Sequence, residues 1–585
     1  MKDKFIQYVN NIYQLINEPI DQIYKITAIQ NCKKKFNINH LESLSKYYFS
    51  CTDDNKQNGV VYTPLEIAEF IVKKTITDKD IINNPFIKIV DPACGAGNLI
   101  IPCYNYLKEI YIKNIELINR KNNLNLTPEN IAEHIILNNL YGYDIDDVAI
   151  KVLIIDLYQL GGFINIDNFK LNDFLLEELQ CKYDIFISNP PYVGHKSVDK
   201  VYSAQLKAIY KEIYRDKGDI SYCFFQKSLF NLNKGGKLTF ITSRYFLESP
   251  SGEQLRIILK ELCSINTIVD FYGIRPFKGV GVDPLIIFIN NENSNSEKIQ
   301  VLKPNINKGK NKKEFYQSLF LNKGNNYKNF YVCKGDLNNK GWILRDEDER
   351  NIINKIENHS FTTLANVCNS YQGIITGCDK AFIMNKDELI EKEIEMSIVK
   401  PWIKSSHIGK KYIEKSDQYL IYSDYIENED KYPNSLHYIG QYHDKLINRR
   451  ECRRGVRKWY ELQWGRVPEI FENEKIVFPY KSKNNRFALD KGSFFSADVY
   501  ALRLKENVPF TYDYLLYILN SNLYEFYFKT FAKKLGEDLY EYYPNNLMKL
   551  CIPTMIDYNH NNQGVLYNLF ELNDKEIEII ENNIN

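Results

Sequence analysis

The spacing of apolar residues predicts a helical start followed by a layered α/β region. Residues 1–50 carry apolar side chains at intervals of three and four, which predicts helices, at positions such as Phe5, Tyr8, Val9, Ile12 and Leu15. From about residue 60 to 290, short apolar runs alternate with helical stretches. The strands predicted there are Ile87–Asp91, Leu140–Ile145, Asp184–Ser188, Lys237–Thr242, Thr267–Phe271 and Leu285–Ile289. Such alternation indicates a mostly parallel sheet covered by helices on both faces.

Changes in amino-acid composition along the chain suggest where its domains begin and end. Residues 291–314 are polar and rich in Asn, Lys and Gly, which is typical of a linker. The region from about 330 to 555 is irregular, aromatic-rich and locally basic. We therefore predict a division into an N-terminal helical segment (1–50), an α/β domain (51–295), a linker (296–330), an α+β domain (331–555) and a helical tail (556–585).

Composition narrows the classes of protein without choosing among them. The 585 residues include 44% hydrophobic and 25% charged side chains, and the formal net charge of +1 does not itself indicate a nucleic-acid partner. No two of the twelve cysteines form a CxxC pair, which argues against a zinc site and for reduced thiols. No apolar run follows Met1, and none is long enough to span a membrane. We expect a cytoplasmic protein without a metal.

The strongest chemical signal is the sequence Asn189-Pro190-Pro191-Tyr192, directly after the predicted strand Asp184–Ser188. Two prolines make a rigid turn at the end of the strand, where open sheets bind ligands. The side-chain oxygen of Asn189 and the carbonyl of Pro190 can accept both hydrogens of an exocyclic amine, and Tyr192 can stack on the ring that carries the amine. The alternative is a plain Asn-Pro turn.

Candidate cofactor contacts follow three other predicted strands. Asp91-Pro92-Ala93-Cys94-Gly95-Ala96-Gly97 offers an acid and a glycine turn but lacks the third glycine of a dinucleotide site, which suits a cofactor with a positively charged amino-acid end. Asp144, before Ile145, can accept hydrogen bonds from ribose hydroxyls, and Asp173 with Phe174 can bind an adenine. Taken singly, the glycines are compatible with a simple βα turn, and each acid with a loop cap.

In this order, these motifs resemble those of the DNA amino-methyltransferases of the gamma class. In that family, Gly59-Val60-Val61-Tyr62-Thr63-Pro64 corresponds to the first motif, which closes over the methionine end of S-adenosylmethionine. Phe277 falls where the family places an aromatic residue against the flipped base. Segments 372–382, 457–466 and 495–500 extend the likeness to orphan adenine methyltransferases of clostridia.

The resemblance implies a Rossmann-like methyltransferase sheet with a C-terminal α+β domain that recognises double-stranded DNA. It implies S-adenosylmethionine as the methyl donor and the N6 amine of an adenine, in an adenine-rich asymmetric site, as the acceptor. The cofactor set is then Tyr62, Thr63, Asp91, Ala93, Gly95, Gly97, Asp144, Ile145, Asp173, Phe174 and Asn189. One departure is the long helical insertion at about 102–136, which separates Asp144 from the glycine turn and makes Asp146 an alternative.

The densest positive charge lies in the second domain. Six cations, Arg449, Arg450, Arg453, Arg454, Arg457 and Lys458, precede Trp459 and Trp464. Basic residues interleaved with aromatic ones suit a phosphate backbone and unstacked bases, so we predict a DNA-binding surface here, with a solvated helix face as the alternative. Asn484, Asn485 and Arg486, near a predicted turn, are further candidates for reading base edges.

The predicted chemistry is a direct transfer of a methyl group by positioning, without a catalytic His, Ser or Cys. We expect a monomer that needs no protein partner. Methyltransferases of protein glutamine or ribosomal RNA, which also carry this turn, are one alternative. A fused restriction enzyme is a second, although about 60 residues before Tyr62 leave little room for a nuclease, and a non-enzymatic DNA-binding module is a third.

Overall fold

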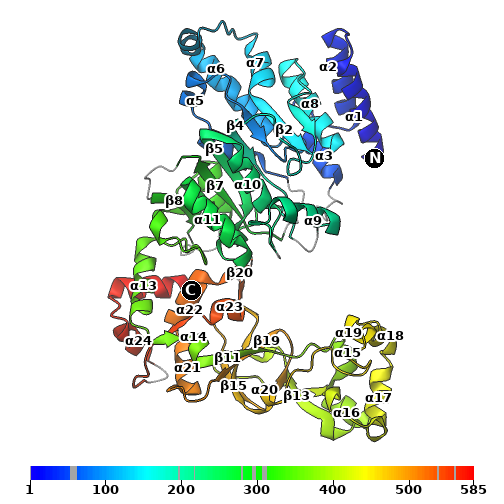
Figure 1. Cartoon of the computed structure of the whole chain (residues 1–585), viewed down its shortest axis with the longest axis vertical. Helices are drawn as coiled ribbons and strands as arrows, with labels where there is room; N and C mark the ends of the chain where they lie inside the picture. The colour runs from blue at the N-terminus through cyan, green and yellow to red at the C-terminus, as the bar shows by residue number, and fades with distance from the viewer. Residues whose placement is uncertain are drawn as a thin grey trace. The chain divides into compact units, whose positions relative to one another are not determined.

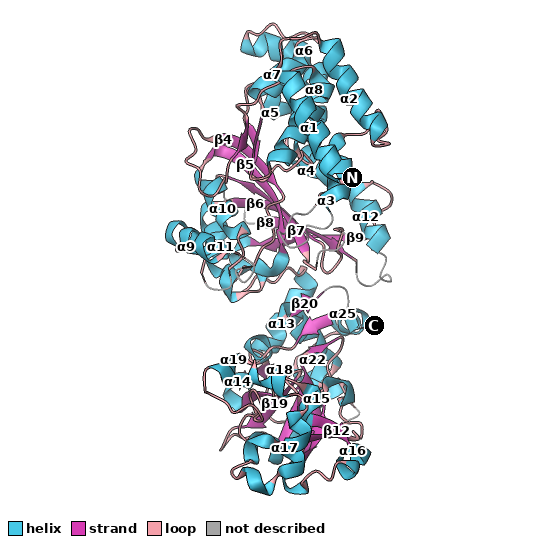
Figure 2. Cartoon of the chain, turned by 90° about the vertical axis from the view of Figure 1, so that its right-hand side faces the viewer, coloured by secondary structure: helices cyan, strands magenta, loops and turns pink. Residues whose placement is uncertain are grey.

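The computed structural model describes residues 2–52, 62–194, 198–215, 218–277, 281–292, 298–305, 312–535, 539–558 and 562–584. The chain divides into two compact units, Met1–Asp346 and Glu347–Asn585. Figure 1 traces both units by residue number, and Figure 2 shows that helices and strands occur in each.

Unit 1 is built on a nine-stranded sheet in the order β3-β2-β1-β4-β5-β7-β6-β8-β9. Its strands are β1 Ile89–Asp91, β2 Leu140–Asp144, β3 Phe169–Leu171, β4 Tyr183–Ser188, β5 Leu232–Ser243, β6 Ser264–Asp270, β7 Pro284–Asn290, β8 Lys298–Pro304 and β9 Tyr327–Cys333. The strands from β3 to β5 are parallel, and β7 runs antiparallel to both β5 and β6. All six predicted strands are present, so the α/β prediction is confirmed.

Helices cover both faces of this sheet. They are α1 Lys2–Asn17, α2 Gln22–Lys35, α3 Leu44–Thr52, α4 Leu65–Thr75, α5 Asp78–Asn83, α6 Ile100–Asn122, α7 Ile131–Asn138, α8 Asp147–Gly161, α9 Lys200–Ile209, α10 Ser221–Phe230, α11 Glu253–Leu262 and α12 Lys312–Phe320, with short 3-10 turns at Arg244–Leu247, Pro250–Gly252 and Lys334–Asp336. Successive residues of β4 enter different cores: Ile185 and Ile187 pack on one face, and Phe186 packs on the other. This two-sided burial explains why the strands have continuous apolar sequences.

The predicted linker at 296–330 is wrong. Strands β8 and β9 and helix α12 lie in this part of the chain and belong to unit 1. Ile299 and Val301 are fully buried in the sheet, and Phe315 of α12 joins the core on the other face. Polar residues surround the short apolar runs of these elements, which is why the sequence predicted a linker. The polar residues 293–297 and 306–311 lie outside the described residues.

Unit 2 contains small mixed sheets and short helices. Its strands are β10 Thr362–Thr363, β11 Cys368–Gln372, β12 Ile383–Asn385, β13 Val399–Ile403, β14 Gln418–Ile421, β15 Glu474–Pro479, β16 Lys481–Ser482, β17 Ala488–Lys491, β18 Phe494–Phe495, β19 Val499–Leu504, β20 Lys533–Leu535, β21 Leu539–Glu541 and β22 Cys551–Ile552. Two four-stranded sheets, β11-β19-β15-β17 and β12-β14-β13-β18, form its centre.

The helices of unit 2 lie around these sheets. They are α13 Glu347–Asn358, α14 Leu364–Val367, α15 Asp379–Phe382, α16 Lys386–Glu391, α17 Pro433–Gly440, α18 His443–Ile447, α19 Arg450–Arg453, α20 Glu469–Glu472, α21 Tyr512–Leu519, α22 Asn522–Phe531, α23 Pro544–Leu547, α24 Gly564–Leu569 and α25 Asp574–Ile584, with 3-10 turns at Met396–Ile398, Ser405–His407, Ser423–Tyr425 and Glu429–Lys431. The expected tail is helical but packs into the unit, because α25 lies against α22 and Lys355 pairs with Glu576 at 2.7 Å.

Three predictions concern features of the whole chain. All twelve cysteines are free thiols, as predicted. Within the parts of the chain listed above, no helix has the length and apolarity needed to cross a bilayer. The same residues contain no cluster of three or more His, Cys, Asp or Glu side chains that would suit a metal ion.

Candidate functional site

The predicted acidic and amide side chains meet at one edge of the unit 1 sheet. Asp91 is the last residue of β1, Asp144 is the last residue of β2, and Asn189 follows β4 directly. These strands are parallel neighbours, so their carboxyl ends lie at the same edge. The topology therefore brings together residues that are up to about a hundred positions apart in the sequence.

The glycine turn after β1 has the backbone that only glycine adopts easily. Gly95 and Gly97 have φ angles of +49° and +92°. A Cβ on Gly97 would lie 2.5 Å from the Cδ1 atom of Leu153, so the turn packs directly on α8. The Gly95 N–H donates to Asp144 Oδ2 at 2.7 Å, which links the turn to the end of β2.

Asp91 is a buried carboxylate whose hydrogen bonds come from neutral groups. Its Oδ1 atom accepts from the Ser188 hydroxyl at 2.7 Å and from the Ala93 N–H at 3.0 Å. The side chain is 2% exposed, and burial raises the pKa of Asp91 to about 7. No cation pairs with it among the residues described, so it is a suitable partner for a positively charged ligand.

Asp144 and its alternative Asp146 have different roles in this geometry. Asp144 accepts from the Gly95 N–H and from the Asp146 N–H at 2.9 Å, and burial raises the pKa of Asp144. Asp146 caps α8 by accepting from Val148 and Ala149. The helix cap explains Asp146 without a ligand, which favours Asp144 as the residue for a cofactor hydroxyl. The neighbouring predicted contact Ile145 is 78% exposed.

Asp173 and Phe174 follow β3 at the same edge. The Asp173 carboxylate accepts from the Leu175 N–H at 2.9 Å, and together with burial it raises the pKa of Tyr202 in α9. Phe174 is 2% exposed and stacks on Phe224 with ring centroids 5.7 Å apart. The phenylalanine is therefore part of the core.

The side chains at the two ends of the Asn189–Tyr192 turn are hydrogen-bonded to each other. The Asn189 Nδ2 atom donates to the Thr63 hydroxyl at 3.1 Å, and the Tyr192 hydroxyl donates to Asn189 Oδ1. The Tyr192 and Phe277 rings are 6.3 Å apart, and both residues are less than 10% exposed. The tyrosine hydroxyl thus occupies the acceptor that the sequence analysis assigned to an exocyclic amine.

The structure adds residues that the sequence patterns did not suggest. From α3, the Tyr48 hydroxyl donates to Asp146, and the Phe49 ring lies 5.1 Å from that of Tyr62, beside the glycine turn. The backbone of Asp219 forms an isolated β-bridge with Gly194, just after the Asn189–Tyr192 turn. Burial raises the pKa of the Asp219 carboxyl to about 6. These contacts are tertiary, so sequence spacing gave no signal for them. Gly59, Val60 and Val61 of the first motif lie outside the described residues.

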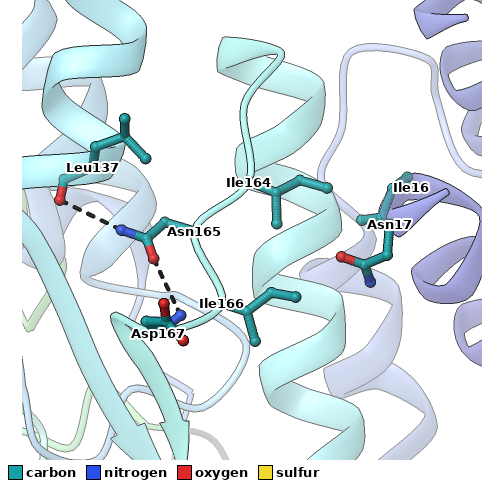
Figure 3. Close-up of a pocket in the computed structure, with 7 residues that line it drawn as sticks. All are labelled: Ile16, Asn17, Leu137, Ile164, Asn165, Ile166 and Asp167. Atoms are coloured by element: carbon teal, nitrogen blue, oxygen red, sulfur yellow. Dashed lines mark hydrogen bonds between the residues drawn. The ribbon is translucent and has the colours of Figure 1, made fainter. Parts of the chain in front are cut away.

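A cavity of about 620 Å³ lies away from this edge. It is lined by Ile16, Asn17, Leu137 and the segment from Ile164 to Asp167 (Figure 3). Leu137 and Asp167 precede β2 and β3, so the cavity is near the opposite ends of those strands. None of the predicted site residues lines it.

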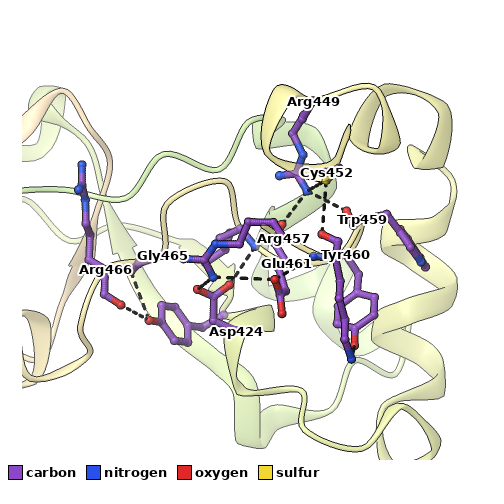
Figure 4. A network of polar contacts seen from close by, with 12 residues as sticks. Asp424, Arg449, Cys452, Arg457, Trp459, Tyr460, Glu461, Gly465 and Arg466 are labelled. Carbon is purple, nitrogen blue, oxygen red and sulfur yellow. Dashed lines mark hydrogen bonds and ion pairs between the residues drawn. The ribbon is translucent and has the colours of Figure 1, made fainter. Parts of the chain in front are cut away.

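Three of the six cations in the predicted basic surface of unit 2 form polar contacts with other residues of the unit. Arg449 is 9% exposed and donates to the carbonyls of Thr376, Trp459 and Glu461 at 3.0, 2.8 and 2.7 Å. Arg457 pairs with Asp424 at 3.1 Å, as Figure 4 shows, and Lys458 pairs with Glu429 at 3.6 Å. Arg449 and Arg457 therefore hold the fold, whereas Lys458 stays exposed beside an exposed acid. The burial of Arg449 corrects the prediction of one continuous DNA-binding face.

The other three cations, Arg450, Arg453 and Arg454, are exposed on and after α19. Of the aromatic candidates, Trp464 is 40% exposed, whereas Trp459 packs edge-on against His443 at 5.0 Å. Asn485 is 1% exposed and bonds to the Leu519 carbonyl, so it holds the turn rather than facing a ligand. Any DNA-binding surface must therefore be smaller than the sequence suggested.

The three segments that extended the resemblance into unit 2 lie side by side. Ile375 pairs with Trp464, and Ile374 pairs with Ser496. A Cβ on Gly373 would be 2.1 Å from the Ser496 carbonyl, so only glycine permits this approach.

Comparison with known proteins matches both units to restriction-modification proteins. Residues 81–173 match the MmeI DNA-methyltransferase domain, 138–277 the Eco57I restriction-modification methylase family, and 400–552 the TaqI-like C-terminal specificity domain. These segments are similar to restriction-modification methylases and to the specificity domain of a TaqI-like enzyme.

Two type II methyltransferases are similar to most of the chain. The type II methyltransferase M.BstVI of Geobacillus stearothermophilus is 24% identical over 90% of this chain and 98% of its own length. M.BanIII of Aneurinibacillus aneurinilyticus is 26% identical over 77% and 81%. The structure of the type IIL restriction-modification enzyme MmeI in complex with DNA superposes with a TM-score of 0.62 at 14% identity, over 92% of this chain and 75% of that one, which establishes the fold.

Proposed function

We propose that this restriction-modification-type DNA methyltransferase transfers a methyl group from S-adenosylmethionine to the N6 amine of an adenine flipped out of duplex DNA. The observation that carries the proposal is the Asn189–Tyr192 turn at the end of β4, beside the buried carboxylate of Asp91. The TaqI-like specificity domain in unit 2 supports DNA as the substrate.

S-adenosylmethionine is the cofactor that the methylase relatives imply, and the edge of the sheet fits it. Asp91 is a buried acid with which no cation pairs in the described part of the chain, and this suits the ammonium group of the cofactor. Near Gly95 the nearest atom to an added Cβ belongs to Phe49, at 3.8 Å, so the turn leaves space above its backbone. Bound there, the cofactor supplies an electrophilic methyl group on a positively charged sulfur.

The residues of this chain orient the acceptor amine. The Asn189 side-chain oxygen and the Pro190 carbonyl accept the two amine hydrogens, which directs the nitrogen lone pair out of the plane of the ring. The ring of Tyr192, with that of Phe277, offsets the cost of a few kcal/mol for removing the base from the stack. Because the methylated amine is acidic, its extra proton leaves to water without a catalytic base.

The tyrosine hydroxyl competes with the base amine for the side-chain oxygen of Asn189. In the structure this hydroxyl donates to the side-chain oxygen of Asn189, so that oxygen has a hydrogen-bond donor without substrate. The incoming amine replaces one hydrogen bond with another, and the tyrosine ring becomes available for stacking. The proposed contribution of Tyr192 is therefore its ring and not its hydroxyl.

A direct test is to incubate the purified chain with radiolabelled S-adenosylmethionine and a duplex library with randomised positions. Nucleoside mass spectrometry then identifies the product, and modification-sensitive sequencing identifies the site. N6-methyladenine in one asymmetric, adenine-rich site is the expected result. Parallel reactions contain RNA or protein in place of the library, and transfer in these reactions but not to the duplex would refute the proposal.

A second candidate acceptor is the N4 amine of cytosine. The two oxygens at Asn189 and Pro190 address an exocyclic amine, and cytosine carries one as well. N4-methylcytosine in the same mass spectra would decide for it.

The proposal includes a monomeric enzyme without nuclease activity, like an orphan methyltransferase. Helices α1, α2 and α3 lie within residues 2–52, and α1 and α3 pack on α8 of unit 1. Analytical ultracentrifugation tests the monomer, and incubation of unmodified DNA with Mg²⁺ tests for cleavage.

A further inference from the structure

Helix α3 brings an aromatic side chain to the glycine turn of the candidate site. The nearest atom to a Cβ on Gly95 would be the Cζ atom of Phe49, at 3.8 Å. The Phe49 ring also lies 5.1 Å from the ring of Tyr62, with 60° between the two ring planes. Phe49 is half-buried and Tyr62 is 40% exposed, so both rings keep surface that a ligand can contact. Phe49 belongs to none of the motifs identified in the sequence.

The buried carboxylate of Asp156 in α8 holds the start of α3. Its Oδ1 atom accepts from the Leu44 N–H at 2.8 Å, and its Oδ2 atom accepts from the Ser45 N–H at 3.0 Å. The first N–H groups of a helix have no acceptor inside that helix, so an acid from elsewhere in the fold serves as the cap of α3. Asp156 is 3% exposed, so this cap is sealed from water.

Helix α8 also contacts the other end of α3 and the glycine turn. The Tyr48 hydroxyl of α3 donates to Asp146, which is the N-cap of α8. A Cβ on Gly97 would lie 2.5 Å from the Cδ1 atom of Leu153 in α8. Leu153 and Asp156 are three positions apart, so they lie on the same face of the helix. One helix therefore fixes the position of α3 relative to the glycine turn.

The two rings lie beside the part of the site that would receive the charged sulfur of the cofactor. The proposed site places the ammonium group at Asp91 and the ribose hydroxyls at Asp144. The sulfonium connects these two parts of S-adenosylmethionine and must lie between the two carboxylates. Gly95 occupies this interval, because its turn follows Asp91 and its N–H donates to Asp144 Oδ2 at 2.7 Å. The face of an aromatic ring attracts a cation, and this attraction is lost when the sulfur becomes neutral.

We propose that Phe49 selects the charged cofactor over its neutral product, and that Asp156 is a positioning residue that acts through α3. The Phe49 ring contacts the sulfonium of S-adenosylmethionine, with the Tyr62 ring beside it. S-adenosylhomocysteine, which remains after the methyl group has left, has no positive charge and gains less from the ring. The difference favours exchange of the product for fresh cofactor. The inference rests on the proposed function, because that function places the cofactor at this edge.

The experiment measures the dissociation constants of S-adenosylmethionine and S-adenosylhomocysteine by calorimetry on the full chain. Their ratio requires neither DNA nor turnover. The variants are Phe49→Leu, Phe49→Tyr, Asp156→Asn and the double variant of Phe49→Leu with Asp156→Asn. Leucine keeps an apolar contact without an aromatic face, whereas tyrosine keeps the face, and asparagine keeps one of the two acceptor oxygens of aspartate. Tyr24→Leu is the matched control, because it removes an exposed aromatic ring from α2 of the same N-terminal segment.

The variants should affect the two ligands differently. Phe49→Leu should weaken binding of S-adenosylmethionine by about fivefold and change binding of S-adenosylhomocysteine by less than about twofold. Phe49→Tyr and Tyr24→Leu should keep the wild-type ratio, and the Phe49 variants should keep the wild-type melting temperature.

Asp156→Asn should reduce the same ratio by about threefold, since α3 loses one of its two capping hydrogen bonds. In the double variant this second substitution should leave the ratio of Phe49→Leu unchanged, because the ring through which Asp156 acts is absent. A purely structural role of Asp156 would instead weaken both ligands equally, with or without the ring.

A wild-type ratio in Phe49→Leu would overturn the inference, and so would equal losses for both ligands. An effect of Asp156→Asn on the ratio that persists in the double variant would overturn the positioning role of Asp156. These results leave the proposed function intact, because methylation of duplex DNA is measured separately. Conversely, if the wild-type chain methylates no duplex but Phe49→Leu still loses its discrimination, the proposed function fails and the role of Phe49 stands.

Discussion

The carboxyl edge of the unit 1 sheet and the basic stretch of unit 2 were both predicted from local sequence. They differ in how many of the predicted residues the fold leaves available to a ligand. Asp91, Asp144 and Asn189 meet at one edge, and their groups face the same region. In the basic stretch, Arg449 and Arg457 are bonded within the unit, whereas Arg450, Arg453, Arg454 and Lys458 are exposed.

The difference has a topological cause. Parallel strands carry the residues after them to a common edge wherever those residues lie in the chain, so a strand-end motif has a predictable location. A run of charges on a short helix has no such constraint. Its function depends on which acids and carbonyls the rest of the fold brings near, and Asp424 and Glu429 come from an earlier segment.

The largest effect should come from the strand edge. Asn189→Ala should reduce methyl transfer by roughly a hundredfold to a thousandfold, because the amine loses a fixed hydrogen-bonding partner. Single-turnover kinetics on the cognate duplex measure this loss. Cofactor affinity and melting temperature should stay near wild type, and wild-type turnover would refute the positioning role of Asn189.

Two substitutions at Tyr192 separate the ring from the hydroxyl. Tyr192→Ala should lower kcat/KM by about tenfold to a hundredfold through lost stacking. Tyr192→Phe keeps the ring and removes the hydroxyl that occupies Asn189 Oδ1, so it should retain near-wild-type activity or exceed it. Equal losses in both variants would mean that the hydroxyl itself takes part.

The basic stretch should divide into two classes of residue. Arg453→Ala with Arg454→Ala should weaken binding to every DNA sequence by about tenfold and reduce the log–log salt slope by about 2. Arg449→Ala should instead lower the free energy of unfolding by at least about 2 kcal/mol, since its buried hydrogen bonds are lost. DNA binding against salt and thermal denaturation distinguish the classes, and an unchanged salt slope in the double variant would place the DNA-binding surface elsewhere.

The smallest effect concerns pH. Burial raises the pKa of Asp91 to about 7, above the ordinary value near 4 for an aspartic acid. The folded chain therefore binds a proton that the unfolded chain releases, and the stability of the cofactor-free protein should fall as pH rises from about 4 to 7.

Binding of a positively charged cofactor favours the ionised carboxylate, so affinity should rise severalfold between pH 6 and 8. Calorimetry with S-adenosylmethionine measures both the affinity and the proton released. Asp91→Asn should bind more weakly and with a flatter pH dependence, and a dependence equal to wild type would remove Asp91 from the cofactor site.

The sequence by itself determined the strands of the α/β unit and the order of its motifs. Apolar runs that are buried on both faces, such as Ile185 to Ile187, leave few alternatives, and prolines and glycines restrict the turns that follow them. The prediction was wrong where short apolar runs lie among polar residues. Strands β8 and β9 were predicted to be a linker because they have few buried positions and their surroundings are polar.

Only the tertiary structure decided which polar groups are free. It placed the Tyr192 hydroxyl on Asn189, buried Asp91 with no counter-ion among the described residues, and brought Asp424 to Arg457. It also formed a cavity in unit 2 that is lined by residues as far apart in the sequence as Ser406 and Ile584. Hydrogen bonds and ion pairs act over a few ångströms in space, whereas sequence patterns report only neighbours along the chain, so the availability of a charge or an amide is set by the folded contacts.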